Sequence, residues 1–113
     1  TQNGKNIYPE EIEYYLNSSP LVKECIVLGV NYKGDKETYV NAKLLPDVEA
    51  FKEYLNKDDI TDADIKSEFK KLVTEVNKKL PNYKHIKDFK VVENEFEKTT
   101  TQKIKRFGNN LSM

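Results

Sequence analysis

The 113-residue chain has one cysteine, one histidine, four glycines and no excess of either charge. A single cysteine, Cys25, cannot form an internal disulfide, and its apolar neighbours predict a buried thiol in a reducing compartment. Lysine plus arginine and aspartate plus glutamate number 19 each. Dedicated nucleic-acid or membrane-surface proteins usually show a basic excess, so this balance argues against both classes. No secretory signal peptide and no apolar run of membrane-spanning length occurs in the sequence.

The chain also lacks a self-contained catalytic set. His85 is the only histidine, so neither a Ser-His-Asp triad nor a metal site is expected, and we interpret it as a loop residue. The stretch DDITDAD, residues 58–64, has no glycine and no closing glutamate where a calcium loop needs them, and it is interpreted as a capping segment. No glycine-rich phosphate-binding loop is present.

What the chain does contain suffices for one folded domain. Seven tyrosines and five phenylalanines supply apolar area that disordered chains usually lack. Pro9 suits the first position of a helix, and the two glutamates that follow it favour the positive end of the helix dipole. These residues predict a helix over 8–17. The branched apolar residues of VKECIVLGV, 22–30, predict a largely buried strand.

Alternation predicts the second strand, over residues 38–45. Val40, Ala42 and Leu44 fall on one face of this strand and Asn41 and Lys43 on the other. Separated from the first strand by a turn around Gly34 and Asp35, this segment is expected to pair with it in an antiparallel hairpin.

Two further helices and a third strand are predicted after this hairpin. Asp47 is expected to cap a short helix that turns Val48, Phe51 and Leu55 inward. Thr61 is expected to cap a long helix over about 62–80, and DFKVVEN, 88–94, to form the last strand. The order helix, two strands, two helices, strand predicts a small α+β domain, in which helices flank an antiparallel or mixed sheet of about three strands.

Two stretches remain as candidates for chemistry. NGKNIYPEEIE, 3–13, is a glycine loop that enters the first helix. KTTTQKIKR, 98–106, places three hydroxyls between two lysines, then an isoleucine and two more cations. A helix start and a basic tail explain each stretch alone, but the pair, about ninety residues apart and separated by this order of elements, is far more specific.

With LPNYKHI, 80–86, these stretches resemble the small C-terminal domain of the adenylate-forming enzymes, which include acyl-CoA and aryl-CoA synthetases, peptide-synthetase adenylation domains and luciferase. The family's first signature falls on Gly4, Ile7, Pro9, Glu11, Ile12 and Glu13. The second, typically Pro-Lys-Thr-x-Thr-Gly-Lys-Ile-x-Arg, falls on 97–106, with Glu97 in place of proline and Gln102 in place of glycine. The second stretch looks most like the long-chain fatty acyl-CoA synthetase branch, where this loop is often less glycine-rich.

The resemblance implies an AMP-forming ligase that works in two half-reactions. A carboxylate first attacks the α-phosphate of Mg-ATP to give an acyl-adenylate, and the thiol of CoA then displaces AMP. By resemblance, Lys103 is the catalytic ammonium of the first step, Ile104 anchors its loop, and Arg106 faces a phosphate or carboxylate of the cofactor. The small domain rotates between the steps, so Gly4 and Lys5 are expected to line the CoA tunnel.

The same resemblance implies that this chain is one part of a larger enzyme. Residues 1–107 are expected to be the C-terminal lid and 108–113 a flexible tail. A chain opening on Thr1 is typical of a domain cut from a longer protein, and equally of a processed or trimmed terminus. ATP, Mg²⁺, CoA and the fatty acid are expected to bind mainly to an N-terminal domain of the same polypeptide, so the isolated lid is predicted to be inactive. The enzyme is expected to be cytoplasmic, or peripheral at a membrane through that domain.

Two alternatives stay open from the sequence. The lid of an adenylation domain that loads a carrier protein, in place of CoA, would have the same fold and signatures. A non-catalytic α+β interaction module could use the basic loop at 98–106 to bind an anionic partner, although the neutral net charge disfavours nucleic acid.

Overall fold

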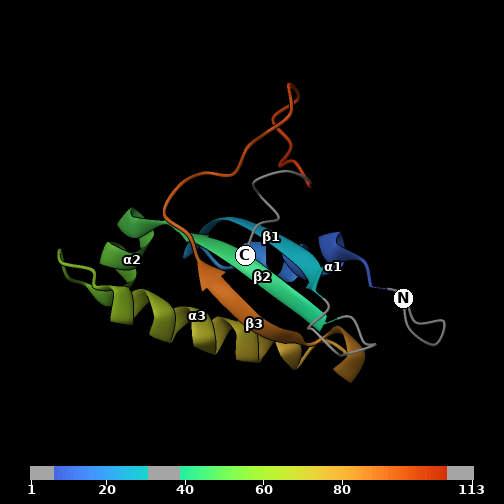
Figure 1. The fold of residues 1–113 in the computed structure, drawn as a ribbon. Coiled ribbons are helices and arrows are strands. Elements are labelled where there is room, and N and C mark those ends of the chain that lie inside the picture. The colour runs from blue at the N-terminus through green and yellow to red at the C-terminus, as the bar shows by residue number, and fades with distance from the viewer. Residues whose placement is uncertain (1–6, 31–38, 107–113) are drawn as a thin grey trace.

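A three-stranded mixed sheet lies at the centre of the computed structural model, which describes residues 7–30 and 39–106 (Figure 1). The elements in chain order are α1 (Pro9–Asn17), β1 (Val22–Val30), β2 (Tyr39–Pro46), α2 (Val48–Leu55), α3 (Asp62–Asn77), the 3-10 turn η2 (Asn82–Lys84) and β3 (Ile86–Val91). The strand order is β1-β2-β3; β1 and β2 are antiparallel, and β2 and β3 are parallel. This arrangement confirms the predicted α+β fold.

Local sequence determines where the helices begin. Pro9 opens α1, and the Asp47 carboxylate accepts the Ala50 N–H at 3.1 Å to cap α2. Thr61 and Asp64 form a capping box at α3, in which each side chain accepts the backbone N–H of the other residue at 3.0 Å. Within the described part of the chain, no helix has both the length and the apolarity to cross a bilayer.

The junction of α3 and β3 differs from the prediction. The helix ends at Asn77 and not near residue 80, because the amides of Lys79 and Leu80 bond to carbonyls three residues back. The side chain of Asn77 accepts the Ile86 N–H at 2.8 Å and donates to the Ile86 carbonyl at 3.1 Å. These two hydrogen bonds fix Ile86 as the first residue of β3, so the strand spans Ile86–Val91 and not 88–94.

The main core lies between the helices and one face of the sheet. The sheet contributes Cys25, Val27, Val40, Ala42 and Leu44, and the helices contribute Ile12, Leu16, Phe51, Ile65, Phe69, Val73 and Val76. The expectation that Val48 points inward is wrong, because Val48 is 44% exposed. As the first residue after the Asp47 cap, it lies at the rim of the core.

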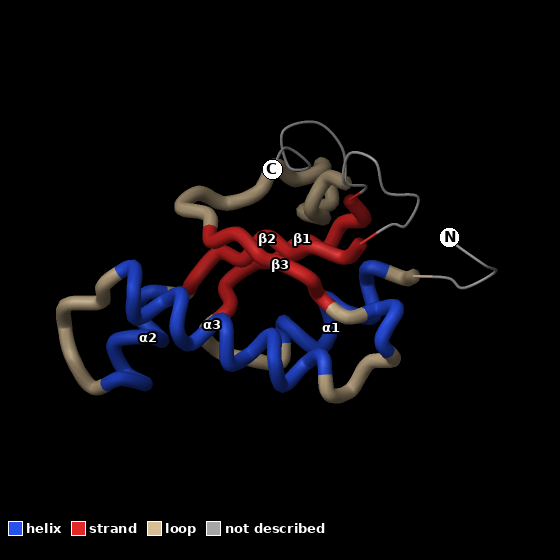
Figure 2. Tube along the Cα trace, turned by 60° about the horizontal axis from the view of Figure 1, so that its bottom comes forward, coloured by secondary structure: helices blue, strands red, loops and turns tan. Residues whose placement is uncertain are grey.

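The C-terminal segment covers the other face of the sheet (Figure 2). Phe96 is buried there against Ile26 and Leu28, and Val92 and Ile104 pack around them in a second, smaller apolar cluster. Asn41 and Lys43, the polar side of β2, are consequently only 4% exposed each. Burial, with the nearby charge of Lys90, lowers the pKa of Lys43.

Candidate functional site

Residues 98–104 of the second signature form a tight hairpin on the side of the sheet opposite the helices. Lys98 and Ile104 pair antiparallel; the Thr99 N–H donates to the Lys103 carbonyl at 2.7 Å, and the Gln102 N–H donates to the Thr99 carbonyl at 2.9 Å. This pattern is typical of a three-residue hairpin loop, whose last residue takes a left-handed conformation. The backbone of the signature is therefore ordered by its own bonds, with Lys103 next to the turn.

Gln102 takes that left-handed position, with φ 66°. The resemblance expects glycine here, and a left-handed conformation costs a non-glycine residue roughly 1–2 kcal/mol. Gln102 therefore adopts the backbone conformation for which the family's usual glycine is suited.

Replacing Gln102 by glycine is expected to stabilise the hairpin by about 1 kcal/mol, which slows amide exchange at Thr99 and Gln102 about fivefold. A branched residue fits the left-handed region poorly, so Gln102→Val should accelerate exchange at the same two positions. Hydrogen exchange followed by NMR measures both variants. Faster exchange in Gln102→Gly than in the natural sequence would contradict this account of the turn.

Lys103 is exposed, and among residues 7–30 and 39–106 no carboxylate lies within ion-pair distance of its ammonium. Its backbone N–H donates to the Thr99 hydroxyl at 3.3 Å, and the Thr99 hydroxyl in turn lies 3.0 Å from that of Thr101. Ile104 is half-buried in the second apolar cluster, as predicted. The threonines and Ile104 thus fix the backbone while the lysine side chain remains in solvent.

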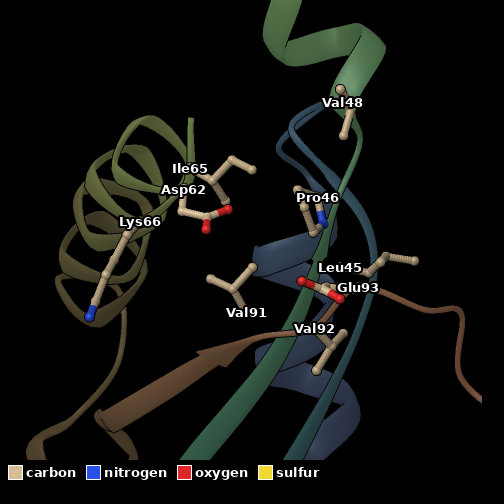
Figure 3. Close-up of a pocket in the computed structure, with 9 residues that line it drawn as sticks. All are labelled: Leu45, Pro46, Val48, Asp62, Ile65, Lys66, Val91, Val92 and Glu93. Carbon is tan, nitrogen blue, oxygen red and sulfur yellow. The ribbon is translucent and has the colours of Figure 1, made fainter. Parts of the chain in front are cut away.

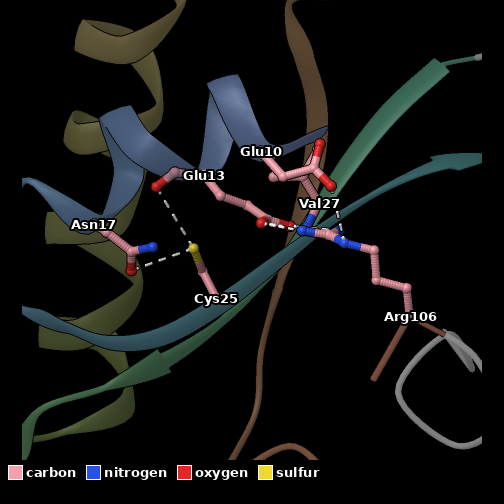
Figure 4. Close-up of polar contacts among 6 residues, drawn as sticks. All are labelled: Glu10, Glu13, Asn17, Cys25, Val27 and Arg106. Carbon is pink, nitrogen blue, oxygen red and sulfur yellow. Dashed lines mark hydrogen bonds and ion pairs between the residues drawn. The ribbon is translucent and has the colours of Figure 1, made fainter. Parts of the chain in front are cut away.

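Arg106 reaches back to α1 (Figure 4). Its guanidinium holds both carboxylate oxygens of Glu13, one through an Nη1–Oε2 bond of 2.8 Å, and its Nε lies 3.3 Å from Glu10. The bonds to Glu13 raise the pKa of Arg106. A ligand anion at Arg106 would have to share or displace these carboxylates, so its assignment to cofactor binding stays a prediction. Gly4 and Lys5 lie outside the described residues.

Glu24 fixes the start of the hairpin as Glu13 fixes its end. The Lys98 ammonium lies 2.6 Å from one oxygen of Glu24, and the Phe96 N–H donates to the other at 3.1 Å. The bond to Glu24 raises the pKa of Lys98. Sequence reasoning missed both partners, although a charged residue inside the buried strand VKECIVLGV was a usable signal at Glu24.

Cys25 points from β1 toward α1 and is buried, as predicted (Figure 4). Its Sγ is 3.5 Å from the Asn17 side-chain oxygen and 4.0 Å from the Glu13 carbonyl. Burial, reinforced by the charge of Glu13, raises the thiol pKa to about 12. The thiol is therefore protonated at neutral pH and a poor nucleophile.

An apolar groove of about 400 Å³ opens between the start of α3 and the ends of β2 and β3 (Figure 3). Leu45, Pro46, Val48, Ile65 and Val91 line it, with Asp62, Lys66 and Glu93 among the flanking residues. The residues that line this groove belong to neither signature. Among the described residues, no group of three or more histidine, cysteine or acidic side chains could hold a metal ion.

Comparison with protein families identifies the domain. Residues 1–108 match the family described as the AMP-binding enzyme C-terminal domain. The chain belongs to this family. The matched range contains both signatures and the three strands of the sheet. No curated protein matches the chain.

Solved structures that share the fold include acyl- and aryl-CoA ligases. The chain is 26% identical to O-succinylbenzoate CoA synthetase (MenE) from Bacillus subtilis, with a TM-score of 0.58. This match covers 91% of the present chain and 17% of the MenE chain. A Mycobacterium tuberculosis fatty acyl CoA synthetase shares the fold at 22% identity (TM-score 0.62; 91% and 17% covered). A benzoate CoA ligase from Burkholderia xenovorans LB400 does so at 24% (TM-score 0.66; 91% and 18%). The chain therefore spans less than a fifth of these ligases.

Proposed function

We propose that the chain is the lid of an AMP-forming acid–thiol ligase of the fatty acyl-CoA synthetase type, and that it supplies Lys103 to adenylation. The observation that supports this most is the pairing of an ordered hairpin with an exposed lysine that has no carboxylate partner among the described residues. An ammonium of this kind is free to enter the active site of another domain, and its long stem extends its reach.

Adenylation brings two anions together, and this explains the need for a fixed cation. The substrate carboxylate oxygen forms a bond to the α-phosphorus of ATP as the bond to the pyrophosphate oxygen breaks. Negative charge develops on the phosphoryl oxygens in this transition state. An ammonium fixed beside those oxygens stabilises the transition state more than the ground state. We assign this role to Lys103.

Thioester formation uses the start of the first signature, in place of Lys103, in this proposal. The CoA sulfur attacks the acyl carbonyl carbon, and the bond from that carbon to the AMP phosphate oxygen then breaks. Gly4, with no side chain, permits close approach of the backbone to the pantetheine arm, and Lys5 lies beside it in sequence. Rotation of the lid between the steps exchanges Lys103 for this loop.

Most of the substrate-binding groups belong to the N-terminal domain of the same polypeptide in this proposal. Among the described residues, no group of three or more histidine, cysteine or acidic side chains could hold a metal ion, and in this proposal the N-terminal domain supplies the Mg²⁺ ligands. ATP, CoA and magnesium are supported by the relatives: one MenE structure contains ATP and a magnesium ion, and another is bound to a CoA-type product analogue.

The full-length polypeptide, purified with its N-terminal domain, tests this function. With palmitate and MgATP it should catalyse pyrophosphate exchange into ATP, and addition of CoA should release AMP and palmitoyl-CoA. The 113-residue chain alone should do neither. Exchange with benzoate but not palmitate would contradict the fatty-acid assignment. Exchange with palmitate and AMP release only with a carrier protein would favour the carrier-loading alternative.

A further inference from the structure

We propose that Glu24 and Glu13 are positioning residues, a two-carboxylate clamp that holds the two legs of the Lys103 hairpin. Glu24 holds the leg that enters the hairpin and Glu13 the leg that leaves it. This inference rests on the proposed role of Lys103 in adenylation, and adds that the role depends on carboxylates far from it in sequence.

Glu24 is placed for this task by its position on β1. The strand has a register shift between Val22 and Glu24. Cys25 faces the main core, so the side chain of Glu24, its neighbour in the strand, points to the opposite sheet face, which the C-terminal segment covers. One of its oxygens accepts a backbone N–H and the other an ammonium, both from the segment 96–98. Its side chain is only 13% exposed, so these charge-assisted bonds are partly shielded from water.

Glu13 performs the corresponding task from α1. β1 is an edge strand, and the Val27 N–H, which β2 does not use, donates to Glu13 Oε2 at 2.8 Å. The same carboxylate binds Arg106 in a bidentate pair and is 12% exposed (Figure 4). One side chain therefore joins the first signature, the sheet edge and the end of the second signature.

The clamp matters because the hairpin makes few apolar contacts within residues 7–30 and 39–106. Apart from Phe96 and Ile104, the segment 93–106 contributes few apolar side chains, and residues 100–103 are exposed. A displacement of about 1 Å at a catalytic group can lower a rate about 10²-fold. The two carboxylates, one before and one after the turn, limit such displacement of the Lys103 backbone.

The full-length enzyme tests the clamp through its two half-reactions. Glu13→Gln and Glu24→Gln remove charge with little change in shape, and Glu75→Gln is the matched control, an exposed glutamate paired with Lys78 on α3. Each clamp variant should slow adenylation, measured by pyrophosphate exchange, about 10- to 100-fold. Thioester formation from a supplied acyl-adenylate should change less than about twofold, and the control should leave both rates unaltered.

Combined variants separate positioning from general damage. In a Lys103→Ala background, Glu13→Gln and Glu24→Gln should cause no further loss of adenylation, because the group they position is gone. Arg106→Gln should slow adenylation at least as much as Glu13→Gln, and adding Glu13→Gln to Arg106→Gln should cause no further loss of the adenylation rate. Circular dichroism checks that each variant is folded. If the Glu13→Gln protein does not fold, Arg106→Lys replaces it in the test, because lysine cannot form the bidentate pair with Glu13.

Each result bears on one of the two proposals. Equal losses in both half-reactions, or further losses in the Lys103→Ala background, would overturn the clamp and indicate a structural role. Normal adenylation by both glutamine variants, with Lys103→Ala impaired, would overturn the clamp alone. Normal adenylation by Lys103→Ala would overturn the proposed function itself.

Discussion

Lys103→Ala in the full-length enzyme should slow acyl-adenylate formation by about 10²–10³, the loss found when one preorganised charge donor is removed. The exposed ammonium has no carboxylate partner among the described residues, so its removal breaks no ion pair there and should leave the domain folded. Thioester formation from supplied acyl-adenylate should proceed at the normal rate. Single-turnover measurement of each half-reaction provides the comparison.

A control substitution at another exposed lysine shows whether adenylation depends on Lys103 itself or only on the net charge of the domain. Lys70→Ala removes an exposed ammonium from α3, away from the hairpin, and should leave both half-reactions unaltered. If Lys103→Ala slowed both half-reactions equally, the division of labour between the two faces of the lid would be wrong. Loss of adenylation in both variants would point to net charge instead of Lys103.

Phe69→Ala should lower the free energy of unfolding by about 3–5 kcal/mol, the usual loss when a buried aromatic ring is deleted. Phe69 is fully buried on α3, and its ring meets that of Phe51 edge to face, with centroids 5.5 Å apart and planes at 69°. The substitution leaves a cavity where α2, α3 and the sheet meet. A typical domain has only about 5–15 kcal/mol of stability in total, so much of it would be lost.

Urea unfolding of the 113-residue chain, followed by circular dichroism, measures this loss. Tyr54→Ala on α2 is the control, because Tyr54 is 64% exposed. The free energy of unfolding of this variant should change by no more than about 0.5 kcal/mol. A loss near 1 kcal/mol for Phe69→Ala would mean that the helices do not pack on the sheet as described.

Much of the fold could be predicted because its signals are local. Pro9 begins α1 through its fixed backbone conformation, and Asp47 and Thr61 begin their helices through bonds to residues three positions on. The alternation along β2 identifies the face that packs against the helices. The predicted boundaries were wrong where distant residues act, as at Asn77, whose side chain binds Ile86 and ends the helix early.

The candidate site divides in the same way. The contiguous motif predicts Lys103 as the catalytic ammonium, and its exposure is consistent with that prediction. The partners of the hairpin were not found, because Arg106 meets Glu13 across 93 residues and Phe96 meets Glu24 across 72. Nor did the polar pattern of Asn41 and Lys43 reveal that the C-terminal segment covers them.

Restoring the amine chemically is the most direct test of the central claim. In a Lys103→Cys enzyme, alkylation with 2-bromoethylamine rebuilds a side chain that ends in an ammonium, whereas Cys25 is buried with a pKa of about 12 and should not react. Alkylated wild-type enzyme controls for reaction at other cysteines. We predict that alkylation raises the adenylation rate of the variant at least about tenfold, as expected for regaining a fixed charge donor. A variant that stays at the Lys103→Ala rate after complete alkylation, beside an active alkylated wild type, would contradict the account.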